Sequence, residues 1–192
     1  MGIGRPCTGP DARWRGTIVY EREDVVVPLP VRLVIFDCDL TLWNHEDASE
    51  LKRPFVLVDE NTVRDQAGTL VSLFPQVRDV LAELERRGYL LSVCSWNYPQ
   101  PVFEMLDLFG LRHYFRHPKV EYHPHKGDMI ARMLDEFAAD GIALSPDQVV
   151  FIDDRTLHTE EILARLPGLH VLQMWVDIKD HNDLLTWLNA GA

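Results

Sequence analysis

From residue 31 onward, short apolar runs of strand length alternate with stretches in which apolar residues recur at helical spacing. The apolar runs are Val31–Phe36, Tyr89–Cys94, Val149–Ile152 and Leu169–Met174. Helices are expected from Pro75 to Gly88 and over Gln100–Phe109, Lys126–Ala139, Thr159–Leu166 and His181–Asn189. Strands that are apolar on both faces and alternate with helices are typical of a parallel sheet covered on both sides. The alternation therefore predicts an α/β fold with a mostly parallel sheet.

The chain of 192 residues is long enough for one domain with its own core. We expect residues 31–192 to form that domain. Residues 1–30 are expected to form an N-terminal arm, partly disordered or folded as a hairpin from Thr17–Tyr20 and Val25–Val27. The stretch 44–70 is polar with a β-rich patch, which predicts a small β flap after the first strand.

The charge and composition argue against several classes of function. A net charge of -11 disfavours nucleic acid and anionic membrane surfaces, because both are bound through clustered Lys and Arg. No apolar stretch is as long as a membrane span, and Met1–Pro10 lacks the apolar core of a signal peptide. We therefore expect a cytoplasmic protein. Cys38 and Cys94 lie in apolar runs without a Cys-x-x-Cys spacing, so we expect small buried side chains rather than metal ligands.

Polar residues follow three of the apolar runs directly or open the helix between them. They are Asp37 and Asp39, then Ser95, then Lys126, and finally Asp153 and Asp154. In open α/β sheets, ligands bind outside the carboxyl ends of the strands. We therefore expect these residues, which come from separate segments, to meet at one edge of the sheet.

The acidic residues of this set suit a magnesium-dependent phosphoryl transfer. Mg²⁺ prefers oxygen ligands, and one or two carboxylates together with a substrate phosphate suffice to bind it. Asp37 with Asp154 or Asp153 would provide the carboxylates. Asp37 would also attack phosphorus as a covalent nucleophile. Asp39 lies two residues further on and is directed roughly the same way, so it would protonate the leaving oxygen and later activate water.

Ser95 and Lys126 would hold the transferring phosphoryl oxygens, Lys126 as a point charge. Each piece also has an ordinary structural interpretation. An Asp-x-Asp-x-Thr sequence occurs in turns, and a Ser or Lys often caps or starts a helix. The combination of all pieces, in this order at consecutive strand ends, favours a phosphoryl-transfer site.

Four residues near these segments are candidates for the substrate rim: Trp43, Trp96, Asn97 and His125. Core packing remains the alternative for the tryptophans. Four histidines crowd one further segment: His113, His117, His123 and His125. Because Pro118 and Pro124 interrupt any helical spacing, a solvated loop is favoured there over a zinc site.

The motifs resemble those of the haloacid dehalogenase superfamily: Asp37-Cys38-Asp39-Leu40-Thr41, then Ser95, Lys126 and Asp153-Asp154. Within it, the chain resembles the small capless magnesium-dependent phosphatases. That likeness rests on Asp39-Leu40-Thr41-Leu42-Trp43 and on Thr62-Val63-Arg64-Asp65-Gln66-Ala67-Gly68 followed by Leu73-Phe74-Pro75. It covers about residues 31–190. Residues 1–30 have no counterpart, and Trp96-Asn97 stands where a more basic residue is expected.

The resemblance implies a Rossmann-like three-layer sandwich, one Mg²⁺ and an aspartyl-phosphate intermediate. It assigns Asp37 as nucleophile and Asp39 as acid/base, with the Asp39 backbone carbonyl on the metal. It favours Asp154 as the direct metal ligand and adds Thr41 to the phosphate-binding residues. The implied substrates are phosphotyrosine-type and sugar phosphates.

Spacing leaves room for only a small flap between the first two motifs, and for a helix and a loop between Ser95 and Lys126. An open site that admits a small molecule or a phosphoprotein follows. Two other functions stay open: an enzyme that loads glyceryl units onto a carrier protein, and a non-catalytic phosphoprotein-binding module. The order of the acidic residues excludes a receiver-type switch, and the oligomeric state is left open.

Overall fold

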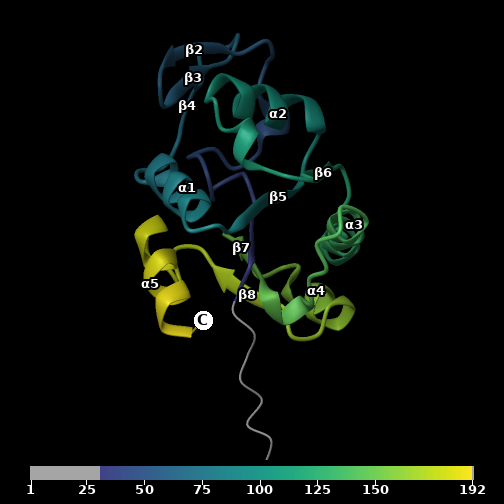
Figure 1. Ribbon diagram of the computed structural model, residues 1–192. Coiled ribbons are helices and arrows are strands. Elements are labelled where there is room, and N and C mark those ends of the chain that lie inside the picture. Colours follow the sequence, from purple (N-terminus) through teal and green to yellow (C-terminus); the bar gives the residue numbers. More distant parts are fainter. Residues whose placement is uncertain (1–30, 192) are drawn as a thin grey trace, which may run out of the picture.

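The computed structural model describes residues 31–191. The predicted arm over residues 1–30, including the hairpin expected from Thr17–Tyr20 and Val25–Val27, lies outside the described residues. A five-stranded sheet occupies the middle of the molecule, in the order β6-β5-β1-β7-β8, and every neighbouring pair in it is parallel (Figure 1). Its strands are β1 (Leu33–Phe36), β5 (Leu90–Trp96), β6 (Lys119–Glu121), β7 (Val149–Asp153) and β8 (His170–Gln173).

Strand β1 lies at the centre of the sheet, and its register with β5 and β7 determines where their last residues lie. Its last residue, Phe36, is in register with Val93 of β5 and Ile152 of β7. The backbone N–H of Asp37 still donates to the carbonyl of Ile152, at 2.8 Å. The residues that follow these three strands therefore emerge at one edge of the sheet, as the sequence predicts.

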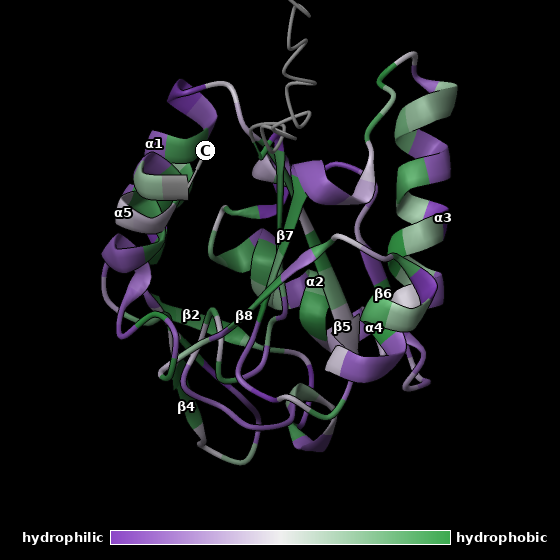
Figure 2. Ribbon diagram, turned by 90° about the horizontal axis from the view of Figure 1, so that it is seen from below, coloured by the Kyte–Doolittle hydropathy of each residue, from purple (hydrophilic) through white to green (hydrophobic). Residues whose placement is uncertain are grey.

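Helices cover both faces of the sheet, which confirms the three-layer α/β fold. They are α1 (Val77–Arg86), α2 (Pro99–Leu108), α3 (Lys126–Ala139), α4 (Thr159–Arg165) and α5 (His181–Gly191). In two perpendicular views, α1 and α5 lie on one side of the sheet and α3 and α4 on the other (Figures 1 and 2).

The alternation of side chains along β1 explains the two layers. Val34 and Phe36 belong to one buried cluster, with side chains of α1, α2 and α5. Leu33 and Ile35 belong to a second cluster, with side chains of α3 and α4. Successive residues of a strand point to opposite faces, so a strand that is apolar throughout builds both cores at once.

The flap is a three-stranded antiparallel sheet of β2 (Val56–Asp59), β3 (Thr62–Arg64) and β4 (Leu70–Ser72). It extends beyond the flap expected within residues 44–70, because its third strand continues to Ser72. Val63 of β3 and Val71 of β4 are fully buried, while all four residues of β2 are exposed. Glu104 of α2 accepts from the backbone N–H of Phe55 at 2.7 Å, which ties the base of the flap to the domain.

Two features of the sheet differ from the expectation. Ser95 and Trp96 are the last residues of β5 rather than residues that follow it. Strand β6 forms inside the histidine-rich segment, where a loop was expected. β6 is three residues long with only Val120 buried, so it leaves no apolar run to recognise in the sequence.

Cys38 and Cys94 are buried and unbridged, as expected. Within residues 31–191, no helix is long and apolar enough to cross a membrane.

Candidate active site

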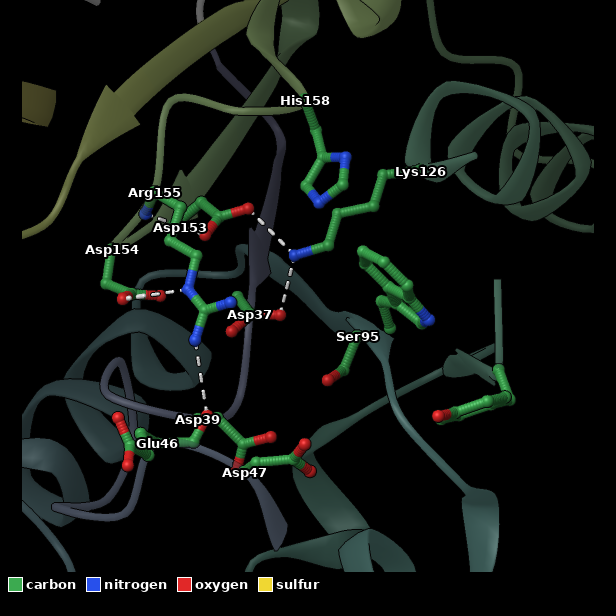
Figure 3. A pocket seen from close by; sticks show the side chains of 12 residues that line it. Asp37, Asp39, Glu46, Asp47, Ser95, Lys126, Asp153, Asp154, Arg155 and His158 are labelled. Carbon is green, nitrogen blue, oxygen red and sulfur yellow. Dashed lines mark hydrogen bonds and ion pairs between the residues drawn. The ribbon is translucent and has the colours of Figure 1, made fainter. Parts of the chain in front are cut away.

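The centre of the site is a buried lysine held between two aspartates, one directly after β1 and one at the end of β7 (Figure 3). Lys126, the first residue of α3, donates from Nζ to Asp37 Oδ1 at 2.7 Å and to Asp153 Oδ2 at 2.8 Å. All three residues are at most 5% exposed. A buried ammonium group with two carboxylate partners is a strong, charge-assisted arrangement, so the three side chains fix one another.

Burial and charge shift the pKa values of this group in a consistent way. Burial raises the pKa of Asp37 to about 8, and the carboxylates of Asp153 and Asp39 add to the rise, while Lys126 opposes it. Burial disfavours the charged form of Lys126, but the two partner carboxylates outweigh it and raise the pKa of the lysine. The crowded carboxylates at this edge of the sheet therefore disfavour the ionised form of Asp37 unless a further cation is bound.

A third carboxylate completes a potential metal site. Asp37, Asp153 and Asp154 each offer an oxygen, and these oxygens all lie within 4.8 Å of one another. Burial, followed by the charge of Asp153, raises the pKa of Asp154 to about 6. Three carboxylates against one lysine form an oxygen-only donor set with surplus negative charge, which fits a hard divalent cation such as Mg²⁺.

Asp39 is held apart from this triad by three donors. Its Oδ1 accepts from Trp43 Nε1 at 2.8 Å and from the backbone N–H of Ala48 at 3.1 Å. Its Oδ2 accepts from Asn97 Nδ2 at 2.7 Å. Burial raises the pKa of Asp39, while the hydrogen bonds from Trp43, Asn97 and Ala48 oppose the rise.

The turn after β1 places Asp39 there. The N–H groups of Thr41 and Leu42 donate back to the carbonyl of Cys38, at 3.2 and 2.8 Å. Leu40 takes a left-handed backbone conformation with φ 51°, and its carbonyl accepts from Trp175 Nε1 at 2.8 Å. This tight turn brings both acidic side chains to the same cavity.

That cavity has a volume of about 150 Å³. A cavity of this volume can hold a molecule of about the size of benzene. A phosphoryl group fits inside it, and the rest of a substrate would remain at the mouth. The cavity is lined by Asp37, Asp39, Glu46, Asp47, Ser95, Trp96, Tyr122, Lys126, Asp153, Asp154, Arg155 and His158.

Residues 28–165 match a family described as acid phosphatase. The chain belongs to this family. It is also 32% identical, over 124 residues, to the human protein named magnesium-dependent phosphatase 1. That alignment covers 64% of this chain and 67% of the human protein.

Solved structures share the fold of this acid phosphatase family member at low sequence identity. A magnesium-bound hydrolase of the haloacid dehalogenase type from Bacillus subtilis superposes with a TM-score of 0.61 at 14% identity, over 84% of this chain and all of the other. A haloacid dehalogenase superfamily hydrolase from Geobacter sulfurreducens gives a TM-score of 0.60 at 16% identity, over 82% and 96%.

A third match is the N-terminal part of a Bacteroides fragilis protein, which contains a phosphatase domain and was solved with Mg. It has a TM-score of 0.60 at 18% identity and covers 85% of this chain and 41% of that structure. The Rossmann-like fold and the resemblance read from the motifs are thus confirmed.

Most of the predicted site residues of this family member do come together. Asp37, Asp39, Ser95, Lys126, Asp153, Asp154 and Trp96 all line the cavity. Trp96 is 40% exposed at the mouth, where the rim was expected.

The prediction of Trp43 as a rim residue is wrong. Its side chain is fully buried, since it packs in the core while its Nε1 holds Asp39. Asn97 is also not at the rim: it is 1% exposed and supports Asp39 from behind. His125 is exposed and lies outside the set that lines the cavity. Its backbone N–H bonds to His123 in the loop before α3.

Thr41 lies away from the cavity as well. Its side chain is fully buried, and its hydroxyl has no hydrogen-bond partner within residues 31–191. The turn that aims Asp37 and Asp39 at the cavity directs Thr41 into the interior. Its backbone carbonyl accepts from His181 Nε2 at 2.9 Å.

Sequence reasoning missed five residues of the cavity wall: Glu46, Asp47, Tyr122, Arg155 and His158. Arg155 and His158 follow the Asp153-Asp154 pair in the same loop, so their position after a strand could have marked them. Tyr122 follows β6, the strand that the sequence did not reveal. Glu46 and Asp47 lie in a polar stretch with no regular pattern.

Proposed function

We propose that this protein is a magnesium-dependent phosphatase that hydrolyses phosphate monoesters through an aspartyl-phosphate intermediate. The observation that carries the proposal is the placement of Lys126 between Asp37 and Asp153, with Asp154 and Asp39 at the same cavity. Membership of the acid phosphatase family and the likeness to a magnesium-dependent phosphatase support it.

Asp37 and Asp154 are the proposed carboxylate ligands of Mg²⁺, together with the backbone carbonyl of Asp39. Both carboxylate oxygens of Asp153 already accept hydrogen bonds, so it is less suited to bind the metal directly. Its Oδ2 accepts from Lys126, and its Oδ1 accepts from the backbone N–H of Arg155 at 3.0 Å. When bound, Mg²⁺ neutralises charge on the phosphoryl oxygens and keeps Asp37 ionised.

In the first half of the reaction, an oxygen of Asp37 attacks phosphorus. A bond forms between that oxygen and phosphorus, and the bond from phosphorus to the leaving oxygen breaks. Asp39 gives its proton to the leaving oxygen, so the alcohol departs neutral. Burial of Asp39 supports this role, because a raised pKa keeps more of the carboxyl protonated near neutral pH.

In the second half, water attacks phosphorus and gives its proton to Asp39. The bond between phosphorus and Asp37 breaks, which releases inorganic phosphate and restores both carboxyl groups. Throughout, Ser95 and Lys126 are the proposed partners of the phosphoryl oxygens. Thr41 supports the turn instead, since its side chain is buried away from the cavity.

The mouth of the cavity supports substrates whose leaving group carries a ring, such as phosphotyrosine-type or sugar phosphates. Trp96 and Tyr122 line it, and the exposed ring of Tyr122 stacks on Tyr98 with centroids 4.0 Å apart. None of the residues that line the cavity comes from the strands of the flap. The mouth is therefore accessible to a small molecule or to a phosphorylated side chain of a protein.

The competing functions are not favoured. A binding module has no need of an acid such as Asp39, and nothing at the cavity within residues 31–191 marks a carrier protein as partner. The net charge of -11 also supports a role without nucleic acid or anionic membrane. A cytoplasmic location stays a prediction.

Phosphate release from p-nitrophenyl phosphate, measured with Mg²⁺ and with EDTA, tests the activity. We expect turnover with Mg²⁺, its loss in EDTA, and its loss in Asp37→Asn. Leu57→Ser, at an exposed flap position, is the matched control and should keep the activity. Turnover that persists in EDTA or in Asp37→Asn would refute the proposal.

A further inference from the structure

His158, the residue before helix α4, is a buried histidine in the cavity wall that the mechanism above does not use. Its side chain lines the cavity, and the residue is only 6% exposed. The ring lies beside Lys126, at the opposite end of the cavity from Glu46 and Asp47 (Figure 3). It meets Trp96 edge-on, with ring centroids 5.8 Å apart.

No hydrogen bond or ion pair joins the ring of His158 to the other residues drawn at the site (Figure 3). Neither nitrogen is among the fully enclosed atoms that lack a partner, so the ring is accessible from the cavity. Polar atoms that face such a cavity hydrogen-bond to water, and a ligand with matching acceptors can take the place of that water. The ring of His158 is therefore placed to bind a ligand inside the cavity.

The charge of the surroundings indicates what that partner is. Burial, and after it the charge of Lys126, lowers the pKa of His158, which favours the neutral form of the ring. A neutral imidazole has one N–H donor and one acceptor nitrogen. Lys126 already has two carboxylate partners. A bound phosphoryl group presents several acceptor oxygens to the same space, and His158 offers a donor that is still free within the described residues.

We propose that His158 is a further substrate-binding residue, whose ring N–H donates to a phosphoryl oxygen of the bound monoester and of the product phosphate. This assignment rests on the proposed function of the cavity. It also gives the edge-on contact with Trp96 a purpose, since that contact sets the orientation of the imidazole. His158 would then contact both Trp96 at the mouth and the bound phosphoryl group.

The rival interpretation is that His158 only packs against Trp96. Three variants separate the two. His158→Phe keeps a ring against Trp96 but has no donor. His158→Asn and His158→Gln place an amide N–H near the positions of the two ring nitrogens and lose the ring.

The experiment measures the affinity of inorganic phosphate in the presence of Mg²⁺ by isothermal titration calorimetry, for the full-length wild type and each variant. Thermal unfolding of each variant shows whether it is folded, and kcat and KM for p-nitrophenyl phosphate are measured in parallel. Loss of a hydrogen bond to a charged oxygen should weaken phosphate binding about tenfold or more in His158→Phe. We expect Asn or Gln to restore most of the affinity.

Two results would overturn the assignment of His158. One is wild-type phosphate affinity in a folded His158→Phe. The other is an equal loss in all three variants, which indicates packing rather than donation. Failure of the proposed function has a different signature: the wild type turns over no phosphate monoester, yet its phosphate affinity still depends on a donor at position 158.

Discussion

At the scale of single residues, the separate roles that we propose for Asp37 and Asp39 follow from their hydrogen-bond partners. Asp37 is joined to Lys126 in the centre of the charged group. Asp39 is turned to three neutral donors from the loop after β1 and from the end of β5. Trp43 and Asn97 were expected to meet substrate, and instead they hold the carboxylate of Asp39, the proposed acid/base.

The role of Asp39 predicts a dependence on the leaving group. General acid catalysis contributes about 10²–10⁴-fold in rate, and it matters most for a leaving group that is a poor anion. In Asp39→Asn, p-nitrophenyl phosphate should still give a burst of p-nitrophenol, because nitrophenolate departs without a proton. β-Glycerophosphate should give none. Rapid-quench kinetics measure both, and equal losses for the two substrates would contradict the role.

The aromatic mouth predicts a difference in substrate affinity. Trp96→Leu and Tyr122→Ala should raise KM for phenyl phosphate more than for β-glycerophosphate, because only the aryl ester can contact the rings. Steady-state kinetics on both substrates provide the measurement, with Leu57→Ser in the flap as the control. A uniform rise in KM for the two esters would argue against an aromatic subsite.

At the scale of secondary structure, the start of helix α3 depends on α4. Both carboxylate oxygens of Glu161 lie within hydrogen-bond distance of the backbone N–H of Gly127, at 3.2 and 3.1 Å. A Cβ on Gly127 would lie 2.8 Å from Glu161 Oε1 and 3.1 Å from Arg165 Cβ. Glycine therefore permits the close approach that positions Lys126, the preceding residue.

Removal of this contact should destabilise the fold and loosen Lys126. Helix N-caps of this kind contribute about 1 kcal/mol, so Glu161→Ala should lower the free energy of unfolding by about that amount. Glu161→Gln keeps an acceptor for Gly127 and should cost less. Urea denaturation measures both variants. Equal stability of wild type and Glu161→Ala would refute the capping role.

Some secondary-structure elements could be predicted from the sequence and others could not, for physical reasons. β1 and β7 are buried on both faces, so their apolar runs and the carboxylates behind them were readable. β6 has one buried residue, and the third strand of the flap is just as short. The cavity residues from such segments, Tyr122 above all, were found only once the sheet brought them beside Ser95 and Lys126.

At the scale of the whole molecule, a buried histidine links the last helix to the active-site turn. His181 opens α5, is 2% exposed, and donates from Nε2 to the carbonyl of Thr41 at 2.9 Å. Its Nδ1 is buried without a partner within residues 31–191. Burial lowers the pKa of His181, against the opposing effects of the Thr41 bond and of Asp180.

The sign of the resulting pH dependence follows from proton uptake. The folded protein keeps His181 neutral, while the unfolded chain binds a proton near the ordinary pKa of about 6.5. The stabilising contribution is therefore complete above that pH and is lost as the pH falls below it. His181→Gln keeps a donor for Thr41 but cannot titrate.

Between pH 7 and pH 5, we expect titration of His181 to lower the free energy of unfolding of the wild type relative to that of His181→Gln, by at most about 1.4 kcal/mol per pH unit. Urea denaturation across this range provides the comparison. Parallel pH profiles would show that His181 is not the cause.

We propose that Asp37 carries the phosphoryl group during magnesium-dependent hydrolysis. A rapid acid quench of the enzyme with ³²P-labelled phosphate monoester, followed by peptide mass spectrometry, tests it directly. We expect label on Asp37 that requires Mg²⁺, is lost in Asp37→Asn and is released by hydroxylamine. Turnover without any labelled intermediate, or label on another residue, would contradict it.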